Sequence, residues 1–99
     1  MTLRDILDDA ALEAGLTPET GTDSVVTWSI GGRPFAILDG DAASFRLDPT
    51  LAAAAGRTPD TQLGTRGPEW VTFRPIELDG HAIDRARAWF AAAARRAAG

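Results

Sequence analysis

The segment that most constrains the fold is residues 66–75, RGPEWVTFRP. A Gly-Pro pair typical of a tight turn precedes aromatic and β-branched residues, and a proline closes the run. We therefore expect a strand over residues 69–74. Because side chains alternate along a strand, Val71 and Phe73 should face a core. The side chains expected to face the other way are those of Trp70, Thr72 and Arg74.

Three strand-like runs precede this segment, over residues 25–30, 33–38 and 43–47. The Gly31-Gly32 pair between the first two is a two-residue hairpin loop that tolerates positive φ at both positions. This loop sets a register in which apolar cross-strand pairs share one face. The predicted pairs are Ile30 with Arg33, Trp28 with Phe35, and Val26 with Ile37.

The loop of the second hairpin decides which face Phe45 takes, because a one-residue slip turns a strand over. A two-residue loop at Asp39-Gly40 would put Phe45 on the face opposite Phe35. A three-residue loop, Asp39-Gly40-Asp41, restores Phe45 to the side of Phe35. We therefore predict the longer loop.

Three segments have the capping residues and apolar spacing of helices. The first follows Thr2 and stops near Gly15, with residues 16–23 as a loop after it. Its expected buried positions are Leu3, Ile6, Leu7, Ala10 and Ala14. The second begins with Asp48 as N-cap and ends at Gly56, before a short strand over residues 61–63.

The third helix should run from Asp79 to about Ala97. Its expected buried positions are Ile83, Ala86, Phe90, Ala94 and Ala97, with Trp89 at the margin. The predicted class is therefore α+β, a two-layer α/β sandwich of order α-βββ-α-ββ-α with the helices on one face of an antiparallel sheet.

Composition limits the classes of function. Ninety-nine residues predict a single domain over residues 1–99. No cysteine and a single histidine exclude a disulfide framework and thiolate or His-rich metal sites, so we expect no metal or cofactor. No apolar run reaches the roughly 20 residues that span a bilayer, and the acidic N-terminus is unlike a signal peptide, so we expect a cytoplasmic protein. The formal net charge is −4.

Several segments resemble the MmcQ/YjbR family of small bacterial proteins in their order and spacing. They are Phe35-Ala36-Ile37-Leu38, Phe45-Arg46-Leu47, Arg57-Thr58-Pro59-Asp60-Thr61, Arg66-Gly67-Pro68-Glu69-Trp70-Val71 and Asp84-Arg85-Ala86-Arg87-Ala88-Trp89-Phe90. The resemblance covers most of the chain from Val25 onward. It implies a two-layer fold like that of secretion chaperones, and the family is commonly labelled DNA-binding.

The residues do not assemble a known catalytic motif. His81 falls in the first turn of the last helix, and there is no G-x-S-x-G nucleophile motif for a hydrolase triad. The Gly31-Gly32 pair lies between strands rather than before a helix, so it does not read as a phosphate loop. Asp48 and Asp79 would occupy the helix amides that an anion needs. We expect a protein that is not an enzyme.

Five residues form the candidate binding surface, because strand parity and nearby loops place them on the sheet face away from the helices. They are Arg46, Arg57, Arg66, Trp70 and Arg74. An aromatic side chain between arginines can stack a base and hold phosphates, which predicts weak DNA contact. Such a tryptophan can equally be covered by arginine stems. The arginines of the last predicted helix are expected to form a solvated surface, with Arg85 stacking on Trp89.

The alternative is a protein-interaction or homodimerisation module with no nucleic-acid role. A sheet covered on one side leaves the other open, and Val25, Leu38 and Trp70 would lie on it. Exposed apolar surface of this kind often marks a partner or dimer interface. Both hypotheses use the same face, and neither involves a membrane or a small-molecule cofactor.

Overall fold

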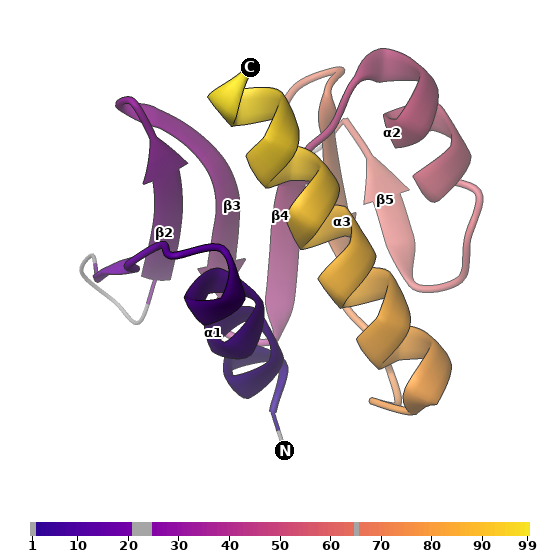
Figure 1. Ribbon diagram of the computed structural model, residues 1–99. Helices are drawn as coiled ribbons and strands as arrows, with labels where there is room; N and C mark the ends of the chain where they lie inside the picture. The colour runs from indigo at the N-terminus through magenta and orange to yellow at the C-terminus, as the bar shows by residue number, and fades with distance from the viewer. Residues whose placement is uncertain (1, 21–24, 65) are drawn as a thin grey trace.

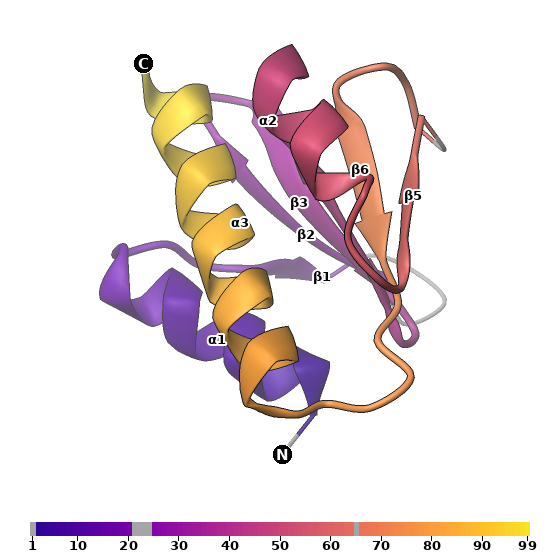
Figure 2. The same ribbon diagram turned by 90° about the vertical axis from the view of Figure 1, so that its right-hand side faces the viewer.

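The computed structural model describes residues 2–20, 25–64 and 66–99. Within these residues, three helices lie on one side of a six-stranded antiparallel sheet of order β1-β2-β3-β4-β6-β5 (Figure 1 and Figure 2). The elements are α1 Leu3–Glu13, β1 Glu19–Thr20, β2 Val25–Ile30, β3 Arg33–Asp39, β4 Ala42–Arg46, α2 Pro49–Ala55, β5 Thr61–Leu63, β6 Trp70–Phe73 and α3 Gly80–Ala98.

The predicted α+β class and the order α-βββ-α-ββ-α are confirmed. The short strand over residues 61–63 is present as β5 and extends the sheet beyond β6. One element is additional: the two-residue strand β1 lies where we predicted a loop over residues 16–23. Residues 21–23 of that loop, like residue 65, lie outside the described residues.

The helices begin where their capping residues predicted. Thr2 and Asp5 form a reciprocal capping box, in which the Thr2 N–H donates to Asp5 Oδ2 at 2.9 Å. This backbone hydrogen bond lowers the pKa of Asp5 below its ordinary value. Asp48 accepts from the N–H groups of Thr50 and Leu51, and Asp79 accepts from Ala82.

The buried faces of two helices differ from prediction at a few positions. In α1 the fifth buried residue is Ala11, whereas Ala14 is exposed at the helix end. In α3, Trp89 is buried rather than marginal, and its ring meets Phe73 edge-on at a centroid distance of 5.2 Å. Ile83 is only partly buried, since α3 turns its alanine stripe towards the sheet.

A β-bulge changes the register of the first hairpin. The pair Ile30–Arg33 is as predicted, but Trp28 lies opposite Ala36 instead of Phe35, and Val26 lies opposite Leu38 instead of Ile37. The irregularity falls between Trp28 and Ser29 and leaves one extra residue on β3. Consecutive residues Phe35 and Ala36 are consequently both buried.

The second hairpin has a shorter loop than predicted. Asp39 pairs with Ala42, so the loop is the two residues Gly40-Asp41, with Gly40 at φ 63°. Phe45 still reaches the helix side, as predicted, because the bulge supplies the one-residue shift that we had assigned to the loop. The same shift buries Leu38, which we expected on the open face, and turns Ile37 towards that face.

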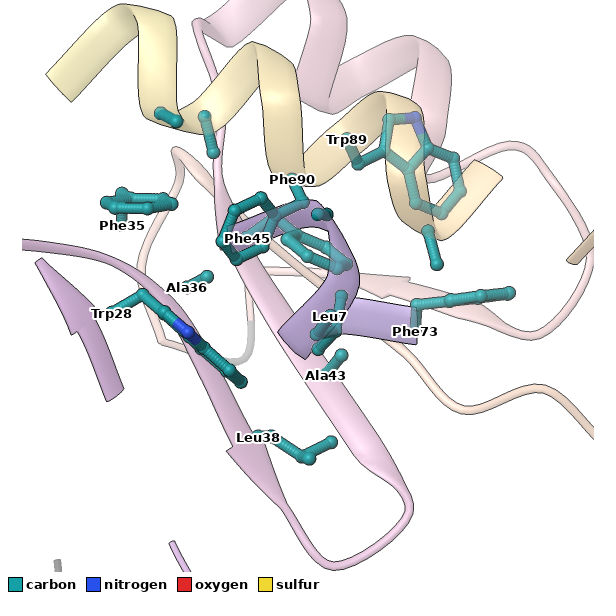
Figure 3. Packing of buried hydrophobic residues seen from close by; sticks show 14 of the residues in the cluster. Leu7, Trp28, Phe35, Ala36, Leu38, Ala43, Phe45, Phe73, Trp89 and Phe90 are labelled. Atoms are coloured by element: carbon teal, nitrogen blue, oxygen red, sulfur yellow. The ribbon is translucent and has the colours of Figure 1, made fainter. Parts of the chain in front are cut away.

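The core lies between the sheet and α3 (Figure 3). Phe90 packs edge-on against Trp28 and Phe35, with centroid distances of 5.6 and 5.2 Å. The alanines of α3 have little side-chain volume, so the helix can approach these rings closely. The indole N–H of Trp28 is buried and has no hydrogen-bond partner among the described residues, and a buried donor left unpaired costs about 1–3 kcal/mol.

Candidate functional site

The sheet face away from the helices is the candidate site, and strand pairing defines its residues. Directly opposed residues on antiparallel strands point to the same side. One row of directly opposed residues crosses all six strands, and none of its members lies on the side that the helices cover. It consists of Glu19, Thr27, Ile37, Ser44, Thr72 and Gln62. We call this surface, with its neighbours Asp39, Trp70 and Arg74, the open face.

A hydroxyl pair lies at the centre of the open face. Ser44 Oγ and Thr72 Oγ1 share a hydrogen bond of 2.9 Å across β4 and β6. Arg66 reaches over the sheet from the preceding loop, and its Nε donates to Ser44 Oγ at 3.3 Å. Only 3% of Ser44 is exposed, so Arg66 covers the centre of the face instead of projecting freely into solvent.

Trp70 lies on the open face, as strand parity predicted, and is half-buried. Its backbone N–H donates to the Gly67 carbonyl at 3.1 Å, which folds the loop back onto the strand. A Cβ at Gly67 would lie 3.5 Å from Cδ1 of the ring. Gly67 has φ 138°, so the loop depends on glycine here for its conformation.

Arg74 also reaches the open face, where it forms an ion pair with Asp41. The distance from Arg74 Nε to Asp41 Oδ1 is 3.1 Å, and both side chains are more than half exposed, at 67% and 79%. An ion pair this exposed contributes about 0–1 kcal/mol and can exchange partners.

Arg46 lies elsewhere than predicted, although its backbone pairs with Trp70. Its Nε donates to Glu69 Oε2 at 2.9 Å, and the other Glu69 oxygen forms an ion pair with Nη2 of Arg96 in α3, also at 2.9 Å. The guanidinium therefore lies at the end of the sheet beside the last turns of α3. The hydrogen bonds from Arg96 and then Arg46 hold the pKa of Glu69 below its ordinary value.

Arg57 is also separated from the predicted group. It is the second residue after α2, and its N–H donates to the Ala54 carbonyl at 3.2 Å. The preceding residue, Gly56, lies close to Leu63, which pairs with Val71 on the helix side of the sheet, so Arg57 is exposed on that side. Of the five predicted site residues, the fold thus brings together Arg66, Trp70 and Arg74.

The arginines of α3 make specific contacts with other elements. Arg85 lies over the ring of Phe73, 5.1 Å from its centroid, rather than on Trp89 as predicted. Arg87 contacts Asp9 and Glu13 of α1, each at 3.6 Å. These guanidinium groups therefore point in different directions and form no single basic stripe.

The sequence reasoning missed the acidic half of the open face. Glu19 was assigned to a loop, because a two-residue strand has too little pattern to recognise. Asp39 was assigned to a turn, whereas it is the last residue of β3 and is exposed. Thr72 was predicted on this face, and parity along β4 was the signal that could also have identified Ser44, which lies directly opposite Thr72.

The single histidine, His81, is the first residue to consider for a catalytic or metal-binding site. His81 is exposed in the first turn of α3, in a shallow groove with Asp79 and Asp84. Within residues 2–20, 25–64 and 66–99, no cluster of histidine and carboxylate side chains could hold a metal ion. Of the helices in these ranges, none has the combined length and apolar character that crossing a bilayer requires.

The chain was compared with models of known protein families, with curated proteins and with solved structures, and none of the three comparisons finds a match.

Proposed function

We propose that this protein is a non-enzymatic association domain whose open face binds a second copy of the same chain. The observation that carries the proposal is the division of charge on that face. Carboxylates lie on the β1–β3 half, at Glu19 and Asp39, and guanidinium groups lie on the β6 half, at Arg66 and Arg74.

A twofold axis running along the strands would set each half of the face against the opposite half of the other copy. A twofold interface uses the same patch on both subunits, so the patch must be complementary to itself. The open face meets this requirement, because its carboxylates and its guanidinium groups lie on opposite halves, with the uncharged Thr27 and Ile37 between Glu19 and Arg66. The exposed Arg74–Asp41 pair costs little to rearrange.

The chemistry of the open face supports binding rather than catalysis. Ser44 is its most buried hydroxyl, and its hydrogen-bond partners are Thr72 and Arg66. Neither partner can accept a proton from serine as a general base, because one is a hydroxyl and the other is permanently charged.

Sedimentation velocity at several protein concentrations tests the proposal. We expect a concentration-dependent dimer that weakens as salt screens the charges. Ile37→Asp, at the centre of the face, should give a monomer. The matched control is Leu12→Asp, because Leu12 is 78% exposed on α1, away from the open face. A wild-type monomer at all concentrations, or equal effects of the two variants, would exclude the proposal.

A second candidate is weak contact with single-stranded nucleic acid, favoured because Arg66, Trp70 and Arg74 share the open face. A half-buried tryptophan can stack a base while flanking arginines hold phosphates. This candidate also agrees with the MmcQ/YjbR resemblance, which stays a prediction. Arg66 and Arg74, of which Arg74 is already paired with Asp41, are few for duplex DNA, whose binding grows with the number of phosphate contacts.

Fluorescence anisotropy of labelled single-stranded and duplex DNA, at two salt concentrations, separates the candidates. Nucleic-acid contact predicts binding at low salt that Trp70→Ala abolishes and that Arg57→Gln leaves within about twofold, because Arg57 lies off the open face. Absence of binding at low salt would exclude nucleic acid and leave self-association.

A further inference from the structure

A cavity of about 200 Å³ lies at the C-terminal end of α3, away from the open face. Three arginines line it: Arg33 from the start of β3, Arg46 from the end of β4, and Arg96 from α3. Its remaining walls are apolar, formed by Pro34, Phe35, Ala93 and Ala97. We propose that this cavity binds a small oxyanion, with a phosphate group as its chemical class.

The local charge favours an anion. The carboxylate of Glu69 forms ion pairs with both Arg46 and Arg96. Three guanidinium groups against one carboxylate leave a net charge of +2 at the cavity. The C-terminal end of α3 opposes this with roughly half a negative charge, which is too little to reverse the sign.

Glu69 arranges the two guanidinium groups without using all of their donors. The Nε–H of Arg46 donates to Glu69, and the two terminal nitrogens of Arg46 have no acceptor among the described residues. Arg33 forms no ion pair within the described parts of the chain, and its side chain is exposed at the mouth of the cavity. Guanidinium groups present donors in a planar fork that matches the oxygens of phosphate and carboxylate.

The size of the cavity selects a small ligand. Its volume of about 200 Å³ is below the roughly 300–1,000 Å³ of sites for drug-sized molecules. In liquid water, roughly seven molecules occupy the same volume. A tetrahedral oxyanion with a few further atoms fits such a space, whereas a nucleotide does not. This inference is independent of the proposed function, because none of the residues that line the cavity belongs to the open face.

An NMR titration with inorganic phosphate tests the inference, with total ionic strength held constant by chloride. We expect saturable shifts at the amides of residues 33–35 and 93–97. Arg33→Gln should weaken phosphate binding about tenfold or more, since it removes charge-assisted hydrogen bonds to the ligand without breaking an ion pair among the described residues. Arg95→Gln is the matched control, because it removes the same charge one residue from Arg96 but lies outside the cavity.

The control should bind phosphate within about twofold of wild type, because Arg95 is solvent-exposed outside the cavity, where salt screens its charge. Equal losses in Arg33→Gln and Arg95→Gln would overturn the inference, since they would mean attraction by overall charge alone. Binding of nitrate as tightly as phosphate would also overturn it, because nitrate is monovalent and planar. A thermal melt of each variant checks that the fold is intact before affinities are compared.

Discussion

The two faces of the sheet have the same strands but opposite environments. On the covered face, Phe45 and Phe73 are fully buried beneath α3. On the open face, the residues next to them in sequence are Ser44 and Thr72, which bond each other and lie under Arg66. Strand alternation therefore separates the residues of the core from those of the surface that we propose for association, residue by residue, along β4 and β6.

The exposed fraction of a residue does not by itself distinguish the two faces of the sheet. Ser44 is as buried as many core residues, with 3% of its surface exposed. The difference lies in chemistry: the covered face is filled by aromatic and aliphatic side chains, whereas polar groups and arginines cover the open face. Substitutions should therefore affect folding on one face and association on the other.

The largest expected effect is on the covered face. Phe45→Ala should lower the free energy of unfolding by about 3–5 kcal/mol, because it leaves a cavity under α3. Ile37→Ala, on the neighbouring strand but on the open face, should cost less than about 1.5 kcal/mol. Urea denaturation followed by circular dichroism measures both. Equal losses would contradict the assignment of Ile37 to an uncovered face.

The second-largest effect on stability is expected for the alanines of α3, because this helix lies close to the sheet. Ala86 is fully buried, so Ala86→Leu should cost about 1–3 kcal/mol by overpacking. Ala88→Leu places the same side chain on the exposed side of the helix and should change stability by no more than about 0.5 kcal/mol. If both variants melt like wild type, α3 lies farther from the sheet than described.

Glu69 lies where the two faces meet, and its ion pairs predict a pH dependence. Its pKa is lowered in the folded state, so its stabilising contribution is complete above the ordinary value of 4.5 and is lost as pH falls through the folded pKa. Glu69→Gln should therefore be less stable than wild type at neutral pH, with the difference shrinking below pH 4.5.

Urea melts from pH 7 to pH 3 measure this dependence. Glu77→Gln provides the control, because Glu77 is exposed and forms no ion pair among the described residues. A difference between wild type and Glu69→Gln that stays constant over the whole range would contradict an electrostatic origin.

The smallest effect is expected for the exposed ion pair of the open face. Arg74→Gln and Asp41→Asn should each change the free energy of unfolding by less than about 1 kcal/mol, and a double-mutant cycle should give a coupling of roughly 0.5 kcal/mol or less. A larger coupling would mean that this pair is rigid, which would weaken the proposal that Arg74 exchanges partners on association.

The sequence by itself determined the helix boundaries, the order of the elements and the sides taken by Trp70 and Val71. These depend on interactions close in the chain: caps at Thr2, Asp48 and Asp79, glycine turns, and alternation along one strand. The α+β class follows from them, because each apolar face needs a covering layer.

Only the tertiary structure decided the register and the grouping of side chains. The bulge opposite Trp28 lets both Phe35 and Ala36 reach the core, a gain that local pattern cannot reveal. The positions of the arginine guanidinium groups were a second feature that the sequence did not determine, because each guanidinium lies several bonds from its Cα. Arg46 thus starts beside Trp70 but binds Glu69 and helps to line the cavity next to α3, since a carboxylate distant in sequence lies within its reach.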